Sequence, residues 1–153
     1  MASASPATAD DATVEAQVTV ATTCITVDPT SIDYGILSFS EVGAATTSFT
    51  NCSAQSQDIF VRGTDASSTT SGATWTLGSS LSCDRLNEYA LHVDDLSTLL
   101  GPVSLIANNQ SLSTEVPSAA VREVNADLSM PCTGSDGAGE TFTFSIIFTA
   151  VGS

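Results

Sequence analysis

The sequence predicts a single all-β domain, an Ig-like or pilin-like antiparallel β-sandwich preceded by an N-terminal extension strand. Three observations favour this fold. Short apolar stretches alternate with polar residues at a period of two, and turn-forming residues separate them. The chain holds 23 serines and 21 threonines, and threonine is favoured in strands over helices. Its 153 residues, 42% of them hydrophobic, suffice for one core and are too few for two.

The start of the chain divides into a leader and an isolated strand. Residues 1–12 are mostly Ala, Ser, Thr, Pro and Asp without periodicity, so we expect a disordered leader. Residues 13–21 then alternate, and their apolar face consists of Val14, Ala16, Val18 and Val20. A polar hinge, Thr22-Thr23, separates this extension from the sandwich domain, which we expect to span residues 24–151.

Period-two stretches continue through the domain and predict nine further strands. The final stretch, 141–150, carries large apolar groups on one face, so we expect one long strand in the middle of a sheet. Loops rich in Ser, Thr and Gly are expected at 64–72 and 131–140. The expected strands are 24–27, 31–37, 44–51, 57–63, 73–77, 89–93, 99–107, 124–130 and 141–150.

The apolar faces of these strands predict the core. Residues two apart point to the same side of a strand, so each core residue is taken from one face of its stretch. The predicted core is Ile32, Tyr34, Ile36, Phe49, Ile59, Val61, Trp75, Leu77, Leu91, Val124, Leu128, Phe142, Phe144, Ile146 and Phe148.

Four scattered cysteines, Cys24, Cys52, Cys83 and Cys132, predict two disulfides and an oxidising, extracellular compartment. Their spacing does not match a zinc site. Three pairings are possible. We favour Cys24–Cys52 and Cys83–Cys132, because Cys24 opens one strand and Cys52 closes the antiparallel strand beside it.

The charge of the chain limits its partners. The net charge is −14, lysine is absent, and Arg62, Arg85 and Arg122 are the only strong cations. A nucleic-acid backbone and an anionic membrane surface would both be repelled, so neither is an expected partner. No apolar run reaches the length of a membrane span, so membrane insertion is not expected. The acidity is that expected of a solvated surface; calcium binding and life in high salt are the alternatives, and the sequence does not decide between those two.

The sequence offers little for catalysis or cofactor binding. His92 is the only histidine, and its position on a strand opposes the apolar face, so we expect an exposed side chain. We therefore expect no enzyme and no cofactor. Asp136 and Glu140 form a weak calcium candidate in the 131–140 loop, and Asp94-Asp95 a weaker one, because carboxylates and carbonyls suit calcium. A plain flexible hairpin is the preferred explanation of the first place, and a capped turn that of the second.

Two features admit a binding role. Trp75 could stack on a sugar, although a tryptophan two residues from Leu77 on one strand face is more often a core residue. Two glycosylation sequons begin at Asn51 and Asn109, in a serine-rich chain where chance matches are common. A disulfide at Cys52 would make the first a poor acceptor.

Several short phrases resemble Ig-like β-sandwich domains of prokaryotic cell-surface proteins. The phrases are Val27-Asp-Pro-Thr-Ser-Ile-Asp-Tyr-Gly35, Thr47–Asn51, Trp75–Leu77, Asn87–Leu91 and Leu128–Pro131. The alternating segment ahead of the domain, with a cysteine linked to one about 28 residues on, is similar to chaperone–usher pilins, archaeal bundling-pilus subunits and biofilm-matrix fibre subunits. That resemblance implies donor-strand complementation, in which the extension of one copy completes the sheet of the next.

The leading hypothesis is therefore a structural subunit of an extracellular filament, a homopolymer in which residues 13–21 act as the donor strand. An intramolecular rival is that the segment docks on its own domain, because a short hinge gives it a high local concentration. The alternative function is a cell-surface adhesin or carbohydrate-binding module that uses Trp75 or the loops. A concave face with exposed aromatic residues around Trp75 would favour the alternative.

Overall fold

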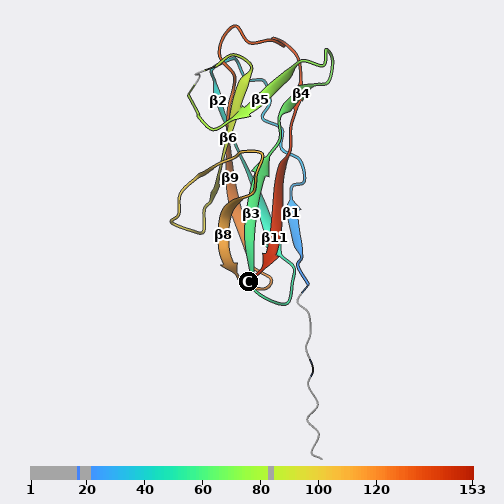
Figure 1. The fold of residues 1–153 in the computed structure, drawn as a ribbon, viewed down its shortest axis with the longest axis vertical. Helices are drawn as coiled ribbons and strands as arrows, with labels where there is room; N and C mark the ends of the chain where they lie inside the picture. The colour runs from blue at the N-terminus through green and yellow to red at the C-terminus, as the bar shows by residue number, and fades with distance from the viewer. Residues whose placement is uncertain (1–16, 18–21, 83–84) are drawn as a thin grey trace, which may run out of the picture.

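A computed structural model describes residues 17, 22–82 and 85–153, and these residues form eleven strands and no helix (Figure 1). Turns rich in Gly, Ser and Pro separate the strands, which is why each strand is short. The strands are β1 (Ile25–Asp28), β2 (Val42–Asn51), β3 (Gln57–Gly63), β4 (Ala66–Ser68), β5 (Thr74–Gly78), β6 (Glu88–Asp95), β7 (Val103–Ser104), β8 (Gln110–Val116), β9 (Val121–Ser129), β10 (Phe142–Thr143) and β11 (Ile146–Gly152).

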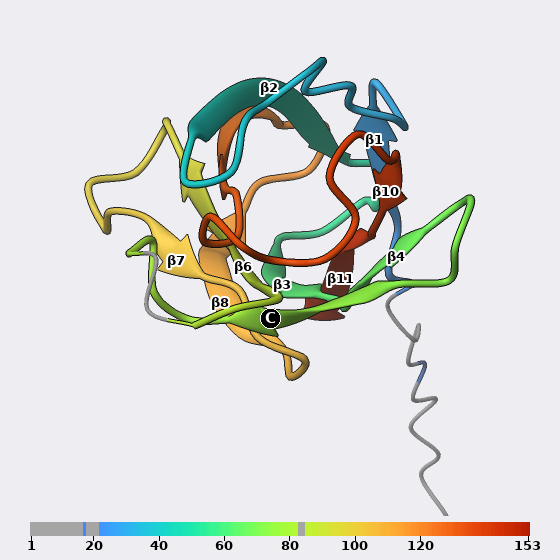
Figure 2. The same cartoon turned by 90° about the horizontal axis from the view of Figure 1, so that it is seen from above.

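The strands build two sheets in a sandwich-like arrangement. The longer sheet runs β1-β2-β9-β6-β5-β4-β10, with β7 also paired to β6, and the shorter sheet runs β11-β3-β8. Every pair among the described strands is antiparallel except β5–β6. Seen from above in Figure 2, the two ends of the longer sheet, β1 and β10, lie on the same side of the molecule. The longer sheet therefore curves around the core.

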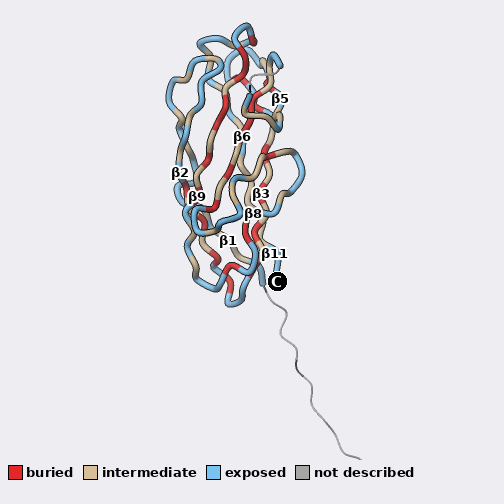
Figure 3. The backbone as a smooth tube through the Cα atoms, turned by 90° about the vertical axis from the view of Figure 1, so that its left-hand side faces the viewer, coloured by how far each residue is buried: buried red, intermediate tan, exposed pale blue. Residues whose placement is uncertain are grey.

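The core lies between β2, β9 and β6 of the longer sheet and β3 and β8 of the shorter one. Buried backbone runs along these strands, while the connecting loops are mostly exposed (Figure 3). Seven predicted core residues are buried: Phe49, Ile59, Val61, Trp75, Leu91, Val124 and Leu128. Seven more are half-buried and pack against that core: Ile32, Tyr34, Leu77, Phe142, Phe144, Ile146 and Phe148.

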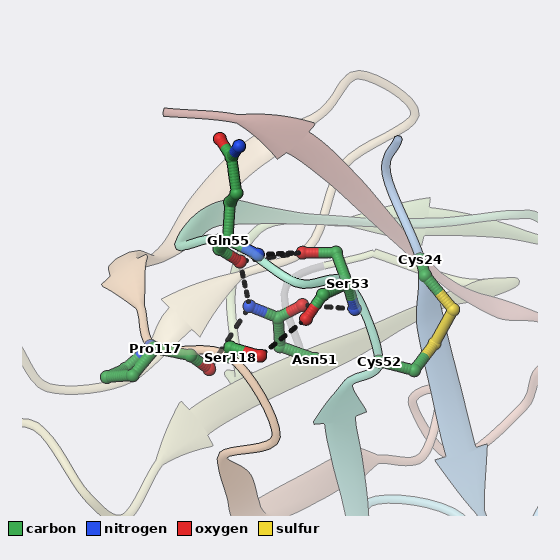
Figure 4. Close-up of a disulfide and its surroundings, with 7 residues drawn as sticks. All are labelled: Cys24, Asn51, Cys52, Ser53, Gln55, Pro117 and Ser118. Atoms are coloured by element: carbon green, nitrogen blue, oxygen red, sulfur yellow. Dashed lines mark hydrogen bonds between the residues drawn. A yellow bond between two sulfur atoms is a disulfide. The ribbon is translucent and has the colours of Figure 1, made fainter. Parts of the chain in front are cut away.

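One end of the sandwich is closed by a disulfide and a buried asparagine (Figure 4). The pairing of β1 with β2 sets Ile25 opposite Asn51 and brings Cys24 to Cys52, which form the expected disulfide. The Asn51 side chain is fully buried and donates hydrogen bonds through Nδ2 to the carbonyls of Gln55, Val116 and Pro117. The loops at this end are therefore held to one another.

The expected strand at 31–37 is absent, and Ile36 is the one predicted core residue that proves wrong. This segment is irregular, and Ile36 is 102% exposed. Gly35 adopts a φ of 70°, a left-handed conformation that glycine tolerates, and this turn breaks the alternation after Tyr34. Ile32 and Tyr34 still face the core, so the prediction fails only beyond the turn.

The final stretch, 141–150, was expected to form one long central strand, and this expectation is wrong. The chain changes sheets at Phe144-Ser145, so that Phe142–Thr143 pairs with β4 and Ile146–Gly152 pairs with β3. Both short strands stand at the ends of their sheets. The alternation is nevertheless kept across the break. Four apolar residues turn to the same side: Phe142, Phe144, Ile146 and Phe148.

Two strands were not expected from the sequence. β4 forms inside the predicted 64–72 loop, and β8 forms in the polar run Gln110–Val116. β8 buries Leu112 and Val116 against the core. The predictions made for the leader 1–12 and for the extension 13–21 lie outside the described residues, apart from Gln17, which is exposed.

Candidate functional site: an open groove between the sheets

An open groove of about 830 Å³ runs along the side of the molecule where the sheets end. Its walls come from β1, β10, β11 and the irregular segment 29–37. Within the described residues, β1 pairs only with β2, β10 only with β4, and β11 only with β3. Each of these three strands therefore turns an edge that carries backbone N–H and C=O groups toward solvent or the groove. In Figure 1, β1 and β11 lie beside each other along this open side.

Aromatic side chains line the floor of the groove. Phe144 contacts two tyrosines, with ring centroids 6.1 Å from Tyr34 and 5.2 Å from Tyr89. Further along, the Trp75 ring stacks on Phe142 at 3.5 Å. These large rings make the floor of the groove apolar and suited to apolar side chains, while polar residues such as Asp33 and Glu140 also line the groove.

The polar atoms of these aromatic residues are already engaged within the protein. The Tyr34 hydroxyl donates a hydrogen bond to the Ala126 carbonyl at 3.1 Å, and the Tyr89 hydroxyl donates one to the Thr64 carbonyl. The indole N–H of Trp75 donates to the Asp136 carbonyl at 3.0 Å. A polar ligand would therefore find these three donors occupied.

Burial raises the pKa of both tyrosines. For Tyr34, burial is the main cause and the Asp127 carboxylate is the second, and together they raise the pKa from 10.0 to about 12. For Tyr89, burial again comes first, followed by Asp65 and then Tyr34, and its pKa is raised further. Both phenols therefore stay neutral at physiological pH, which keeps the groove floor uncharged.

The wall formed by segment 29–37 is held by side-chain hydrogen bonds in place of a strand ladder. Thr47 donates through its hydroxyl to the Pro29 carbonyl at 3.1 Å. The Asp33 carboxylate accepts from the Gly35 N–H at 2.8 Å, and the Leu37 side chain packs closely over Gly43. The segment has the sequence of a strand as far as Tyr34, but no neighbouring strand lies alongside to pair with it in the described structure.

The 131–140 loop forms the rim at the other end of the groove, and it places both predicted calcium ligands in hydrogen bonds. Asp136 accepts from the Asn87 side chain at 2.9 Å. Glu140 accepts hydrogen bonds from the hydroxyls of Ser68 and Ser71. Both bonds lower the pKa of the Glu140 carboxyl, and the bond from Ser68 has the larger effect. Gly137 has a φ of 85°, and an added Cβ would lie 2.4 Å from the Phe142 ring. The loop is thus fitted closely against the groove floor.

No group of three or more metal-ligating side chains occurs among the described residues. The weaker calcium candidate is likewise engaged in the fold. Asp95 is 1% exposed, accepts a hydrogen bond from Ser113, and lies 3.6 Å from Arg122 in an ion pair. Asp94, beside it, has one buried carboxylate oxygen without a hydrogen-bond partner.

His92 lies away from the groove, on the face of β6 opposite the core. It is half-buried, and its Nε2 is 2.9 Å from the Ser104 hydroxyl on β7. In the described part of the chain, no carboxylate is hydrogen-bonded to this histidine. Trp75 is 5% exposed and stacked on Phe142, so its faces are covered as a core position predicts.

The structure brings together some of the residues predicted to matter and leaves others untested. Cys24 and Cys52 are joined. Cys132 is also disulfide-bonded, and its expected partner Cys83 lies outside the described residues. The proposed donor residues Val14, Ala16, Val18 and Val20 lie there too. Sequence reasoning missed the groove itself, although four of its aromatic floor residues, Tyr34, Trp75, Phe142 and Phe144, were predicted as core.

Comparison with known proteins gives no further assignment. No protein-family model matches the sequence, and a search of curated proteins finds no similar one. Among the described residues, no helix has the length and apolar character needed to cross a membrane.

Proposed function

We propose that this chain is a structural subunit of an extracellular filament, and that residues 13–21 of one copy fill the groove of another. The domain would then be a pilin-like sandwich that is completed by an extension strand from its neighbour. The open groove between β1 and β10–β11 is the observation that carries this proposal. Each copy would donate its extension strand to one neighbour and accept the strand of another. Such head-to-tail contacts need not close into a ring, so a linear chain of copies results.

The first support is the match between the groove and the segment. Three strand edges border the groove, and an added strand would pair their backbone groups while its alternate side chains enter the apolar interior. Residues 13–21 have that alternation, with small β-branched residues at 14, 18 and 20. The segment would span about 30 Å as a strand.

The second support is the chemistry of the groove, which favours a peptide strand over a carbohydrate. Sugars are held by hydrogen bonds to their hydroxyls as well as by stacking on exposed aromatic faces. Here the donors on Tyr34, Tyr89 and Trp75 are used internally, and Trp75 is buried against Phe142. A strand that turns its apolar face, Val14, Ala16, Val18 and Val20, into the groove needs none of these donors, because it brings its own backbone groups for the edges.

The third support is the compartment that the disulfide implies. The Cys24–Cys52 bond, at the base of the extension, persists in an oxidising environment such as the cell exterior. The bond also fixes the point from which residues 13–21 leave the domain, because β1 begins directly after Cys24. No catalytic role is proposed, since the ring of His92 meets a single serine and lies outside the groove lining.

Electron microscopy of two matched variants tests the proposal. Val18→Asp puts a charge on the face of the segment that would enter the groove, where it would have no partner. Thr19→Asp adds the same charge to the opposite face. We expect the full chain to form fibres, Thr19→Asp to keep them and Val18→Asp to lose them. Fibres that are equally abundant in both variants would contradict the proposal.

A further inference from the structure

The chain contains two sequons for N-linked glycosylation, and their asparagine side chains differ in exposure: one is buried and the other lies at the surface. Asn51-Cys52-Ser53 lies at the closed end of the sandwich, and Asn109-Gln110-Ser111 lies where the loop after β7 leads into β8. A glycan is attached through the side-chain nitrogen of asparagine, so the folded protein must leave space for a sugar on that nitrogen. The two positions therefore serve as an internal comparison.

A glycan on Asn51 is incompatible with this fold. Asn51 is 0% exposed, and its Nδ2 lies 2.8 Å from the Gln55 carbonyl, 2.8 Å from the Val116 carbonyl and 3.1 Å from the Pro117 carbonyl. Figure 4 shows this nitrogen enclosed by the surrounding loops beside the disulfide. A sugar on Nδ2 would remove a donor from these bonds and would have no space.

Asn109 has the opposite surroundings. It is exposed, as are its neighbours Ala107 and Asn108, and its carboxamide makes no hydrogen bond to any described residue. The Gln110 side chain instead donates to the backbone carbonyl of Asn109 at 3.1 Å, which shapes the loop and leaves the Asn109 side chain free. The Ser111 side chain of the sequon is exposed as well.

We propose that Asn109 is an acceptor for an N-linked glycan and that Asn51 is not. In the transfer, Nδ2 of Asn109 forms a bond to the anomeric carbon of a lipid-linked oligosaccharide and loses one proton. The bond from that carbon to the lipid phosphate breaks, and the lipid phosphate leaves with the bonding electrons. The proposal depends on the extracellular location in the proposed function, because the transfer takes place on chains that cross a membrane.

Mass spectrometry of the secreted full chain tests this inference. The chain would be produced behind a secretory signal in a eukaryotic host that carries an oligosaccharyltransferase, and collected from the medium. We expect a glycan mass on the peptide that contains Asn109 and none on the peptide that contains Asn51. Treatment with a peptide-N-glycosidase should remove the mass and leave aspartate at position 109.

Three variants make the assignment specific. Asn109→Gln and Ser111→Ala should each abolish the added mass, and Ser111→Thr should keep it because the sequon survives. A secreted, disulfide-bonded chain with an unmodified Asn109, or with glycan on Asn51, would overturn the inference. Filament formation is measured separately on unglycosylated protein with the Val18 and Thr19 variants, so the two proposals can fail independently.

Discussion

The closed end and the open side of this sandwich are built from the same kind of strand but differ in the contacts that the chain makes there. At the closed end, the disulfide and the buried Asn51 tie the loops together, and each Nδ2 donor of Asn51 has an acceptor. Along the open side, β1, β10 and β11 stop at a groove with aromatic residues on its floor. Within the described residues, the closed end is therefore held by its own contacts, whereas each strand along the open side has a single neighbouring strand.

Removing one buried and one half-buried phenylalanine gives the largest expected contrast. Phe49→Ala in the core removes a side chain that is 0% exposed, and should lower the free energy of unfolding by about 3–5 kcal/mol. Phe144→Ala at the groove removes a half-buried ring and should cost clearly less. Guanidinium unfolding of unassembled protein would measure both. Equal losses of unfolding free energy in the two variants would mean that the groove wall is packed as tightly as the core.

The closeness of the 131–140 loop to the groove floor can be tested at Gly137. Its φ of 85° and the 2.4 Å approach of the Phe142 ring leave no room for a methyl group. Gly137→Ala should therefore cost about 1–3 kcal/mol. Gly139→Ala is the control: its φ is 79°, yet nothing lies within 4 Å of an added Cβ. If the two variants lose the same stability, backbone strain alone explains the effect, and the contact with Phe142 contributes nothing.

The sequence predicted the buried core better than the open side, because alternation of apolar and polar residues carries only part of the information that a fold needs. Alternation records which face of a strand is apolar, so Phe49, Ile59 and Val124 were assigned correctly to the core. It does not record whether a neighbouring strand exists. Segment 31–37 has the pattern of a strand, but none of the described strands pairs with it. Residues 141–150 have the pattern of one central strand but are divided between two sheet edges.

Long-range contacts account for what the pattern could not reveal. β8 was missed because Gln110–Val116 is largely polar, and it becomes a strand through its pairing with β3. The groove was missed because its lining residues were indistinguishable from core. Phe142 and Phe148 are half-buried and pack against the core, so alternation alone does not separate a groove lining from a closed core.

The pKa of the groove tyrosines is expected to change least, and its measurement reports how far the open side is exposed to water. The chain has two tyrosines, and both line the groove. Burial raises the pKa of Tyr34 from 10.0 to about 12, so the neutral phenol is favoured in the folded state. The stability that this contributes is complete below pH 10 and is lost as the pH rises toward 12.

Ultraviolet absorbance of phenolate should therefore appear above the usual pH in monomers, and at a still higher pH in filaments, where a donor strand would cover Tyr34. A tyrosine that titrates at its ordinary pH would show that the groove floor is open to water.

The central claim is that residues 13–21 of one copy occupy the groove of another, and isotope-mixed photo-crosslinking tests it most directly. A small aliphatic diazirine side chain would replace Val18, and equal amounts of light and nitrogen-labelled heavy chains would be mixed before assembly and irradiation. The account predicts crosslinked peptides that join segment 13–21 of one isotope to residues 27–37 or 139–148 of the other. Crosslinks that join only chains of the same isotope would mean that each segment fills its own groove, and crosslinks to residues outside the groove would contradict the account altogether.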